Sequence, residues 1–138
     1  MKQRILTGIL LLFFCNIIIA QDADTLKYEN LSAGDFELNY RKDDKALLID
    51  VREFFEYRKS RLKNAINIPS SGNLEFASDT ISKDNSLYLY CTSGYRSKRA
   101  AAFFGKQGFS KVYSLDGGIK GWKQEGKPIE KKRIRRRD

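Results

Sequence analysis

One cysteine stands where an apolar run meets a helical pattern, in the segment SLYLYCTSGYRSKRAAAFF. The mostly apolar residues 86–90 predict a buried strand, and the pattern from Arg96 onward predicts a helix. Cys91 therefore lies at the carboxyl end of a strand, where parallel α/β sheets bind their ligands. A sulfur at this position is a candidate nucleophile, because the thiolate is the reactive form of cysteine and a helix start favours negative charge.

The loop that follows Cys91 contains groups that can hold a charged sulfur. Gly94 permits a positive φ angle and a close main-chain approach, so consecutive N–H groups of a curled loop can converge on one anion. The helix start behind the loop and the positive charge of Arg96 add to this field, and Lys98 and Arg99 lie nearby. Such surroundings lower the pKa of a cysteine from about 8.5 to about 3.5–7.5. We therefore expect the thiol of Cys91 to be acidic and accessible.

No imidazole is available to assist this cysteine, because the chain contains no histidine. A cysteine–histidine protease, a serine–histidine hydrolase and a histidine-ligated metal site are therefore excluded. The two cysteines are Cys15 and Cys91, and the first lies in a segment that we expect to be removed. One remaining thiol can form neither an intrachain disulfide nor a thiolate zinc site. The loop itself must therefore activate Cys91.

The first twenty residues have the pattern of an export signal. Lys2 and Arg4 precede a mostly apolar run over residues 5–20, which has the length of a signal core plus its cleavage region and is short for a membrane span. We expect residues 1–20 to be a cleaved signal peptide that takes Cys15 with it. An uncleaved N-terminal membrane anchor is the alternative. Both interpretations imply export, and we predict a periplasmic location in a bacterium.

The mature chain would have 118 residues, which is enough for one domain and too few for two. We expect a polar leader over residues 21–27, a single domain over residues 28–129 and a basic tail over residues 130–138. Of the net charge of +9, residues 21–126 carry only +2. The tail is interpreted as a solvated cationic segment, with contact to an anionic surface as the alternative. Nucleic acid is not an expected partner, and the sequence does not indicate an oligomeric state.

Strand and helix patterns alternate along the mature chain. Such alternation predicts an α/β fold in which a mostly parallel central sheet has helices on both faces. Residues 70–85 are expected to be a loop with at most one helical turn. Trp122 is expected to face the core. The phenylalanine pairs 54–55 and 103–104 are each expected to have a core-facing residue with a half-buried neighbour. The expected strands are residues 28–31, 46–50, 64–69, 86–90 and 111–115, and the expected helices are residues 33–40, 52–60, 96–107 and 117–126.

Three motifs in this chain resemble the rhodanese sulfurtransferase family. CTSGYRS is similar to the active-site loop of that family, and LLIDVREFFEYRKSRLKNAINIP resembles its Asp-Val-Arg segment and the following Asn-Ile-Pro strand end. GFSKVYSLDGGIKGWKQEGKPI resembles its C-terminal segment with paired glycines and a tryptophan. The resemblance covers residues 28–129 and implies the rhodanese-like three-layer fold. The sequence departs from the family at Ser60-Arg61-Leu62, where many members have Gly-His-Ile; we expect this to change a turn.

The resemblance also implies a reaction. Cys91 would attack the outer sulfur of a donor such as thiosulfate, carry that sulfur as a persulfide and release it to an acceptor. The donor would be a small sulfur-containing anion, and the acceptor would be cyanide, a small thiol or a protein thiol. The resemblance implies neither a metal nor an organic cofactor. This sequence would therefore encode a thiosulfate sulfurtransferase-type enzyme.

The resemblance assigns roles to further residues by position. The main-chain amides of the loop would bind the transferred sulfur, and Thr92, Ser93 and Tyr95 would form the rim that selects the donor. Arg96 would brace the loop and supply charge. Asp50 and Arg52 would support the loop from behind, although an ordinary ion pair at a strand end explains them equally well. The residues placed around the transferred sulfur are Thr92, Ser93, Gly94, Tyr95, Arg96 and Ser97.

Two other functions remain open on the sequence alone. Cysteine-dependent phosphatases and arsenate reductases of the same fold have one residue more between cysteine and arginine than the four that separate Cys91 from Arg96. The shorter loop closes a tighter ring, which suits a single sulfur better than phosphate. A non-catalytic persulfide carrier or partner-binding module is the other alternative, because a fold does not imply an activity.

Overall fold

A computed structural model describes residues 27–132 of the chain. The expected signal peptide, nearly all of the polar leader, and the tail from residue 133 lie outside the described residues. Within the described part, no helix is both long enough and apolar enough to cross a lipid bilayer.

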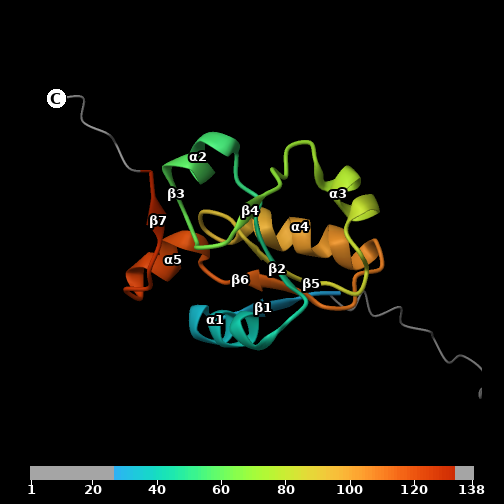
Figure 1. Cartoon of the computed structure of the whole chain (residues 1–138), viewed down its shortest axis with the longest axis horizontal. Coiled ribbons are helices and arrows are strands. Elements are labelled where there is room, and N and C mark those ends of the chain that lie inside the picture. Colours follow the sequence, from blue (N-terminus) through green and yellow to red (C-terminus); the bar gives the residue numbers. More distant parts are fainter. Residues whose placement is uncertain (1–26, 133–138) are drawn as a thin grey trace, which may run out of the picture.

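A parallel five-stranded sheet forms the centre of the molecule (Figure 1). Its order, β1-β6-β5-β2-β4, places β5 in the middle, and every residue of β5 is buried. All four pairings are parallel, as the alternating pattern predicts. The strands are β1 (Glu29–Leu31), β2 (Ala46–Asp50), β4 (Ile66–Asn67), β5 (Ser86–Tyr90) and β6 (Val112–Leu115).

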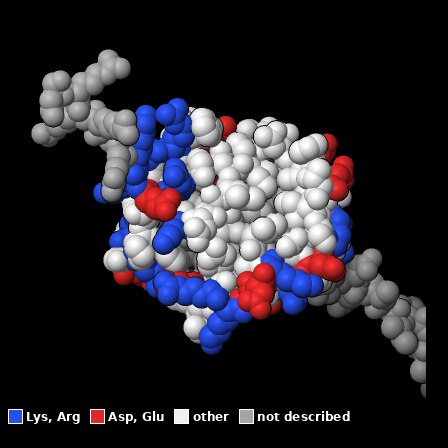
Figure 2. Space-filling model, in the orientation of Figure 1, with Lys and Arg blue, Asp and Glu red and all other residues white. Residues whose placement is uncertain are grey.

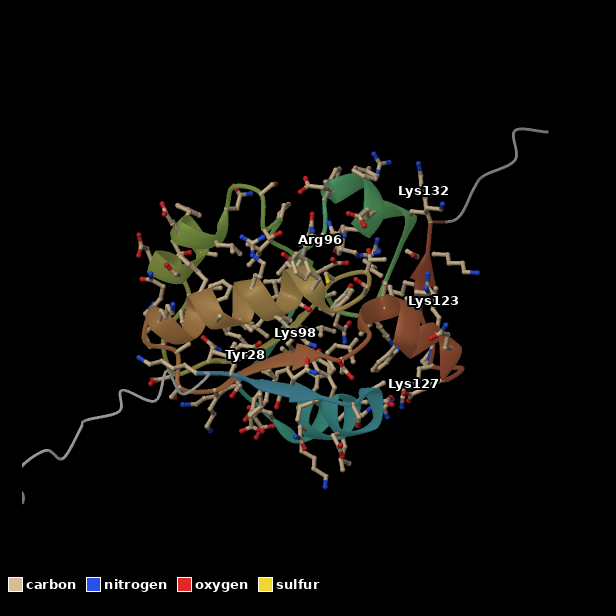
Figure 3. All side chains as sticks on the ribbon, turned by 180° about the vertical axis from the view of Figure 1, so that it is seen from behind. Tyr28, Arg96, Lys98, Lys123, Lys127 and Lys132 are labelled. Carbon is tan, nitrogen blue, oxygen red and sulfur yellow. The ribbon has the colours of Figure 1, made fainter. Side chains whose placement is uncertain are left out.

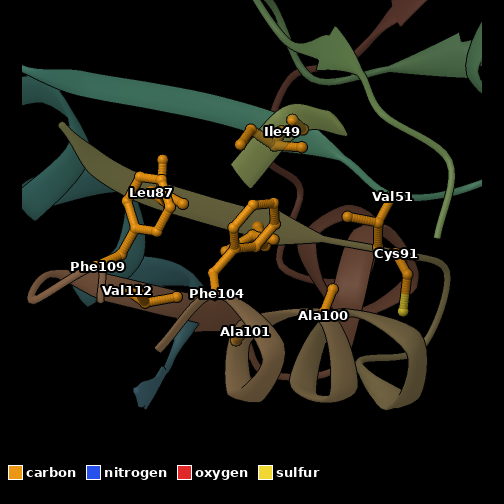
Figure 4. Close-up of a cluster of buried hydrophobic side chains, with 11 residues drawn as sticks. Ile49, Val51, Leu87, Cys91, Ala100, Ala101, Phe104, Phe109 and Val112 are labelled. Atoms are coloured by element: carbon orange, nitrogen blue, oxygen red, sulfur yellow. The ribbon is translucent and has the colours of Figure 1, made fainter. Parts of the chain in front are cut away.

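Helices cover both faces of this sheet, which gives the three-layer α/β architecture expected from the sequence (Figure 1). Side chains alternate along β5, so Leu87 and Leu89 pack under α4 while Tyr88 and Tyr90 pack on the opposite face. Figure 4 shows the core cluster between the sheet and α4. Cys91 lies at one end of this cluster. The helices are α1 (Ala33–Lys42), α2 (Phe54–Lys59), α3 (Leu74–Thr80), α4 (Tyr95–Lys106) and α5 (Gly118–Gln124).

The segment over residues 70–85 contains the helix α3, so the prediction of a loop with at most one helical turn was wrong. Leu74, Ala77 and Ile81 follow one another at helical spacing and pack against the core cluster beneath α4. Polar residues and a glycine surround these positions in the sequence and weaken the helical pattern. Burial of the three apolar side chains against the core therefore stabilises this helix. The helix propensity of the segment alone does not predict it.

A second, antiparallel sheet joins two segments far apart in the chain, β3 (Ser60–Arg61) and β7 (Glu130–Lys131). Two of the three residues that depart from the family pattern, Ser60 and Arg61, therefore lie in a strand and not in a turn, while Leu62 follows the strand. Arg61 forms an ion pair with Glu130 at 3.2 Å, and the amide of Lys132 donates to the carbonyl of Lys59 at 3.3 Å. The first residues of the expected tail are thus part of the folded domain.

The aromatic residues divide between core and surface. Trp122 is buried and its indole N–H donates to the carbonyl of Pro128 at 2.9 Å, and Phe104 is buried beside the half-buried Phe103, as predicted. Phe54 and Phe55 are 58% and 73% exposed, so the prediction of a core-facing residue in this pair was wrong. No residue of α2, the helix that contains both side chains, is buried.

Candidate active site

Cys91 directly follows β5, and the chain turns from there into α4. Gly94 precedes the first helical residue with φ at 99°, a backbone conformation that other residues rarely adopt. A Cβ atom at Gly94 would lie 3.4 Å from the amide nitrogen of Gly117. Glycine therefore both closes the loop and lets the main chain of a neighbouring segment approach it.

The sulfur of Cys91 receives hydrogen bonds from this loop and from the first turn of α4. The amide of Gly94 donates to Sγ at 3.1 Å, and the hydroxyl of Ser97 lies 3.6 Å from Sγ. The same hydroxyl donates to the carbonyl of Gly94 at 3.1 Å and receives a hydrogen bond from Ser114 at 3.0 Å. Polar donors therefore converge on the sulfur, which is more than a small hydrophobic side chain needs.

These contacts set the acidity of the thiol. Burial alone would raise the pKa of Cys91, because a charged sulfur is poorly solvated in the interior. The amide and hydroxyl of Ser97, together with the amides of Ser93 and Gly94, outweigh burial and bring the pKa of Cys91 below its ordinary value. The thiolate is thus stabilised without any histidine.

The expectation that Cys91 is accessible was wrong for this conformation, because its side chain is only 1% exposed. The sulfur points toward the first turn of α4 (Figure 4), and Cys91 belongs to the same buried cluster as Val51 and Ala100. The loop thus encloses the sulfur that it stabilises. Any reaction at Sγ requires the loop or its neighbours to move far enough to admit a reactant.

Arg96 connects the loop to α2 through a carboxylate that the sequence analysis missed. Its guanidinium donates to both oxygens of Glu56 at 2.8 and 2.9 Å, and also to the hydroxyl of Thr92 at 3.1 Å. The Thr92 hydroxyl donates in turn to Glu56 at 2.9 Å. Arg96 therefore braces the loop, but its charge is neutralised by Glu56. In the sequence, the only distinguishing feature of Glu56 is its position early in an expected helix. That position does not indicate that Glu56 pairs with Arg96.

This pairing makes Glu56 strongly acidic. The hydrogen bond from Arg96 is the main cause, and it outweighs the opposing effect of burial, so the pKa of Glu56 falls to about 2 from an ordinary value of 4.5. Because the folded-state value is the lower one, the carboxylate stabilises the fold above pH 4.5 and loses that effect as the pH falls toward 2.

We expect the variant Glu56→Gln to change the acid dependence of stability. The free energy of unfolding, measured with urea at successive pH values, should fall less steeply between pH 4.5 and 2 in this variant than in the wild type. The exposed Glu125→Gln serves as the control and should keep the wild-type slope. Equal slopes for Glu56→Gln and the wild type would contradict the assignment.

The loop also rests on α5, through the paired glycines of the sequence. The amides of Ile119 and Lys120 donate to the carbonyls of Cys91 at 2.9 Å and of Thr92 at 3.0 Å. Gly118 has φ at 57°, and a Cβ atom there would lie 2.5 Å from the carbonyl oxygen of Cys91. Glycine is therefore required where α5 meets the loop.

A family model described as "Rhodanese-like domain" matches residues 32–125. The chain belongs to the rhodanese-like domain family. This rhodanese-like domain superposes on a rhodanese-related protein from Thermoplasma volcanium with a TM-score of 0.65 and 32% identity, covering 75% of this chain and 98% of that one. It also superposes on a Rhodopseudomonas palustris protein described as a possible tyrosine phosphatase, with a TM-score of 0.67 and 27% identity, covering 79% and 89%.

Curated relatives of this rhodanese-like domain are longer proteins. It is 40% identical to a tRNA uridine(34) hydroxylase from Hamiltonella defensa over 83 residues, which are 56% of this chain and 23% of that protein. It is 32% identical to the protein of the same name from Escherichia coli K12 over 112 residues, which are 74% of this chain and 32% of that protein. The chain thus spans about a third or less of these relatives.

Asp50 and Arg52 form a buried ion pair at the end of β2, and Asp50 is fully buried. The guanidinium of Arg52 donates to both carboxylate oxygens of Asp50 at 2.6 to 3.1 Å and to the carbonyl of Ser60 at 2.6 Å. It also lies 5.6 Å from the ring of Tyr90, the residue before Cys91. The pair therefore holds the chain around the site and supports the loop only indirectly.

The remaining predicted residues lie on the outside of the loop. Tyr95 is 68% exposed, and Arg99 lies 5.8 Å from its ring. Ser93 is exposed, although its amide contributes to the acidity of Cys91. Lys98 pairs with Asp116 at 3.5 Å. The predicted rim residue Thr92 also lines a surface groove, which lies beside α2 and α5.

Proposed function

We propose that this rhodanese-like domain is a sulfurtransferase that carries sulfane sulfur as a persulfide on Cys91. The observation that carries the proposal is the hydrogen bond of 3.1 Å from the amide of Gly94 to Sγ, in a loop that also lowers the pKa of the thiol. Amide donors that stabilise the thiolate also suit the negative outer sulfur of a persulfide. One group of donors thereby serves both states of the reaction cycle.

The proposed reaction balances without an external oxidant. The thiolate of Cys91 attacks the outer sulfur of thiosulfate, a sulfur–sulfur bond to Cys91 forms, and sulfite leaves with the electron pair of the broken bond. Cyanide or an acceptor thiolate then attacks the outer sulfur of the persulfide. The new bond gives thiocyanate or an acceptor persulfide, and the thiolate of Cys91 is regenerated.

Access to the sulfur is part of the proposal. Hydrogen bonds among Thr92, Glu56 and Arg96 connect the loop to α2. If the loop opens, either α2 moves with it or these hydrogen bonds break. Formation of the connection after loading would exclude water from the persulfide. A phosphatase is less well supported, since only four residues separate Cys91 from Arg96.

Intact-mass spectrometry tests the proposal directly. After incubation with thiosulfate under non-reducing conditions, the protein should gain the mass of one sulfur atom, and cyanide should remove it. Cys91→Ser should gain nothing. A protein that loads sulfur but does not turn over with cyanide or thiols would be a carrier and not an enzyme. A wild-type protein that gains no sulfur from thiosulfate, polysulfide or a thiol persulfide would overturn the proposal.

A further inference from the structure

A groove of about 560 Å³ runs beside the catalytic loop, between α2 and α5. Thr92 lies on the loop side, Lys59 belongs to α2, and Lys120 and Lys123 belong to α5. Phe55, which is 73% exposed, contributes an apolar wall. We call this feature the lysine groove. Figure 3 shows Lys123 on α5 and Lys132 just after the end of β7, on the same side of the molecule.

The charge of the lysine groove is uncompensated by the described part of the chain. Within residues 27–132, Lys59, Lys120 and Lys123 form no ion pair with a carboxylate. Glu56, the carboxylate in the groove, is already held by Arg96. Lysine and arginine side chains gather over the same end of the molecule, near α2 and β7 (Figure 2). The surface therefore favours an anionic ligand.

Lysine and arginine side chains also line the surface next to the lysine groove. A second hollow of about 450 Å³ shares Phe55 and Lys59 with it and is also lined by Arg58, Lys131 and Lys132. The pairing of β7 with β3 places the last two of these residues there. A ligand that extends along this surface thus meets positive charge on α2, α5 and β7, with the ring of Phe55 between the two hollows.

The size of the lysine groove does not match thiosulfate. Pockets of about 300–1,000 Å³ accommodate organic ligands of the size of cofactors and drugs, and the lysine groove falls within that range. A small tetrahedral anion at the loop would leave the space between α2 and α5 unused. The apolar side chains of Phe55 and Ile119 suit the carbon skeleton of a larger ligand, and the lysines suit its acidic groups.

Hydrogen bonds between α5 and the loop fix the position of the lysine groove relative to Cys91. The amide of Lys120 is hydrogen-bonded to the carbonyl of Thr92, and that of Ile119 to the carbonyl of Cys91. Lys120 and Lys123 are three residues apart on a helix, so their side chains project on the same face. A ligand held by these two lysines therefore has a fixed position relative to the loop, with one end beside Thr92.

We propose that the lysine groove binds the organic part of a low-molecular-mass thiol persulfide that carries carboxylate groups, and that this persulfide donates sulfur to Cys91. The inference rests on the proposed function and names the donor class for it. The thiolate of Cys91 attacks the terminal sulfur of the donor, the donor sulfur–sulfur bond breaks, and the organic thiol leaves with the electron pair and the proton of the former persulfide. In the reverse direction, the same groove binds the thiol as an acceptor.

Glutathione persulfide, whose organic part carries two carboxylates, is a suitable probe. The double variant Lys120→Glu/Lys123→Glu should raise its KM for loading Cys91 by about fivefold or more, whereas the KM for thiosulfate should change by less than about twofold. The matched control Lys106→Glu/Lys111→Glu makes the same change in net charge at residues outside the groove and should leave both values unchanged. Added salt should reduce the effect on glutathione persulfide.

Direct binding gives a second measurement that does not depend on turnover. S-methylglutathione cannot donate sulfur, and calorimetric titration should detect its binding to the wild type and to the control, but only weakened binding to the groove variant. Equal effects on both donors, or equal binding of S-methylglutathione to all three proteins, would overturn the groove assignment. The proposed function would stand in that case, provided that thiosulfate still loads Cys91. A chain that no donor loads would fail as a sulfurtransferase, whatever the titration shows.

Discussion

Cys91→Ser lowers the rate of sulfur transfer from thiosulfate to cyanide by at least about a thousandfold, because no other side chain in the loop can form a persulfide. The serine oxygen is nearly isosteric with the sulfur, so the amides of the loop keep their positions. The rate is measured as thiocyanate formed at saturating thiosulfate. Thermal unfolding of the variant, within a few degrees of the wild type, shows that the loss is chemical and not structural.

A relocated thiol provides the matched control for this experiment. In Cys91→Ser/Ser71→Cys the thiol content is unchanged, but the sulfur lies in the exposed segment before α3, without the amide of Gly94 and the hydroxyl of Ser97. We expect this double variant to remain as inactive as Cys91→Ser. Substantial activity in either protein would mean that the loop is not the site of transfer.

Arg52→Met destabilises the fold by about 3–5 kcal/mol, because it leaves the fully buried carboxylate of Asp50 without its cation. The carbonyl of Ser60 loses a donor at the same time. This loss is a large part of the total stability of a small domain, which is about 5–15 kcal/mol. Urea denaturation followed by circular dichroism gives the free energy of unfolding.

The control for Arg52→Met is a surface pair in the same region. Arg61→Met removes the partially exposed ion pair with Glu130, and it should change the free energy of unfolding by no more than about 1 kcal/mol. If Arg52→Met were as mild as Arg61→Met, the buried pair would not hold the chain at the end of β2. Loss of sulfur loading without loss of stability would instead indicate a direct role for Arg52.

Elements with strong local patterns were predicted with accurate bounds. The strands β2 and β5 have the predicted ends, because each contains an apolar run of four residues with a polar residue at one end, Asp50 in β2 and Ser86 in β5. The helix α4 begins one residue before its predicted start, since Gly94 marks the turn that precedes it. The position of Cys91 at a strand end follows from these two elements. The presence of a short loop between them, whose amides can face the sulfur, follows as well.

Contacts between distant segments could not be predicted from local patterns. The pairing of β3 with β7 joins Ser60 to Lys131, and nothing within either segment indicates the other. Glu56 lies forty residues from Arg96 in sequence, yet the two side chains make the bidentate contact that braces the loop. Charge alone does not select this partner, because the chain has 17 acidic residues.

The sequence by itself determined the chemistry that this protein can attempt: one thiol in the expected mature chain, no histidine, and a glycine-containing loop between a buried strand and a helix. Only the tertiary structure decided that the sulfur is enclosed, that Arg96 is neutralised by Glu56, and that lysines of α2 and α5 face one groove. The physical reason is that residue types and short periodicities fix local geometry and donor groups. Burial and charge pairing depend instead on which distant segments pack together.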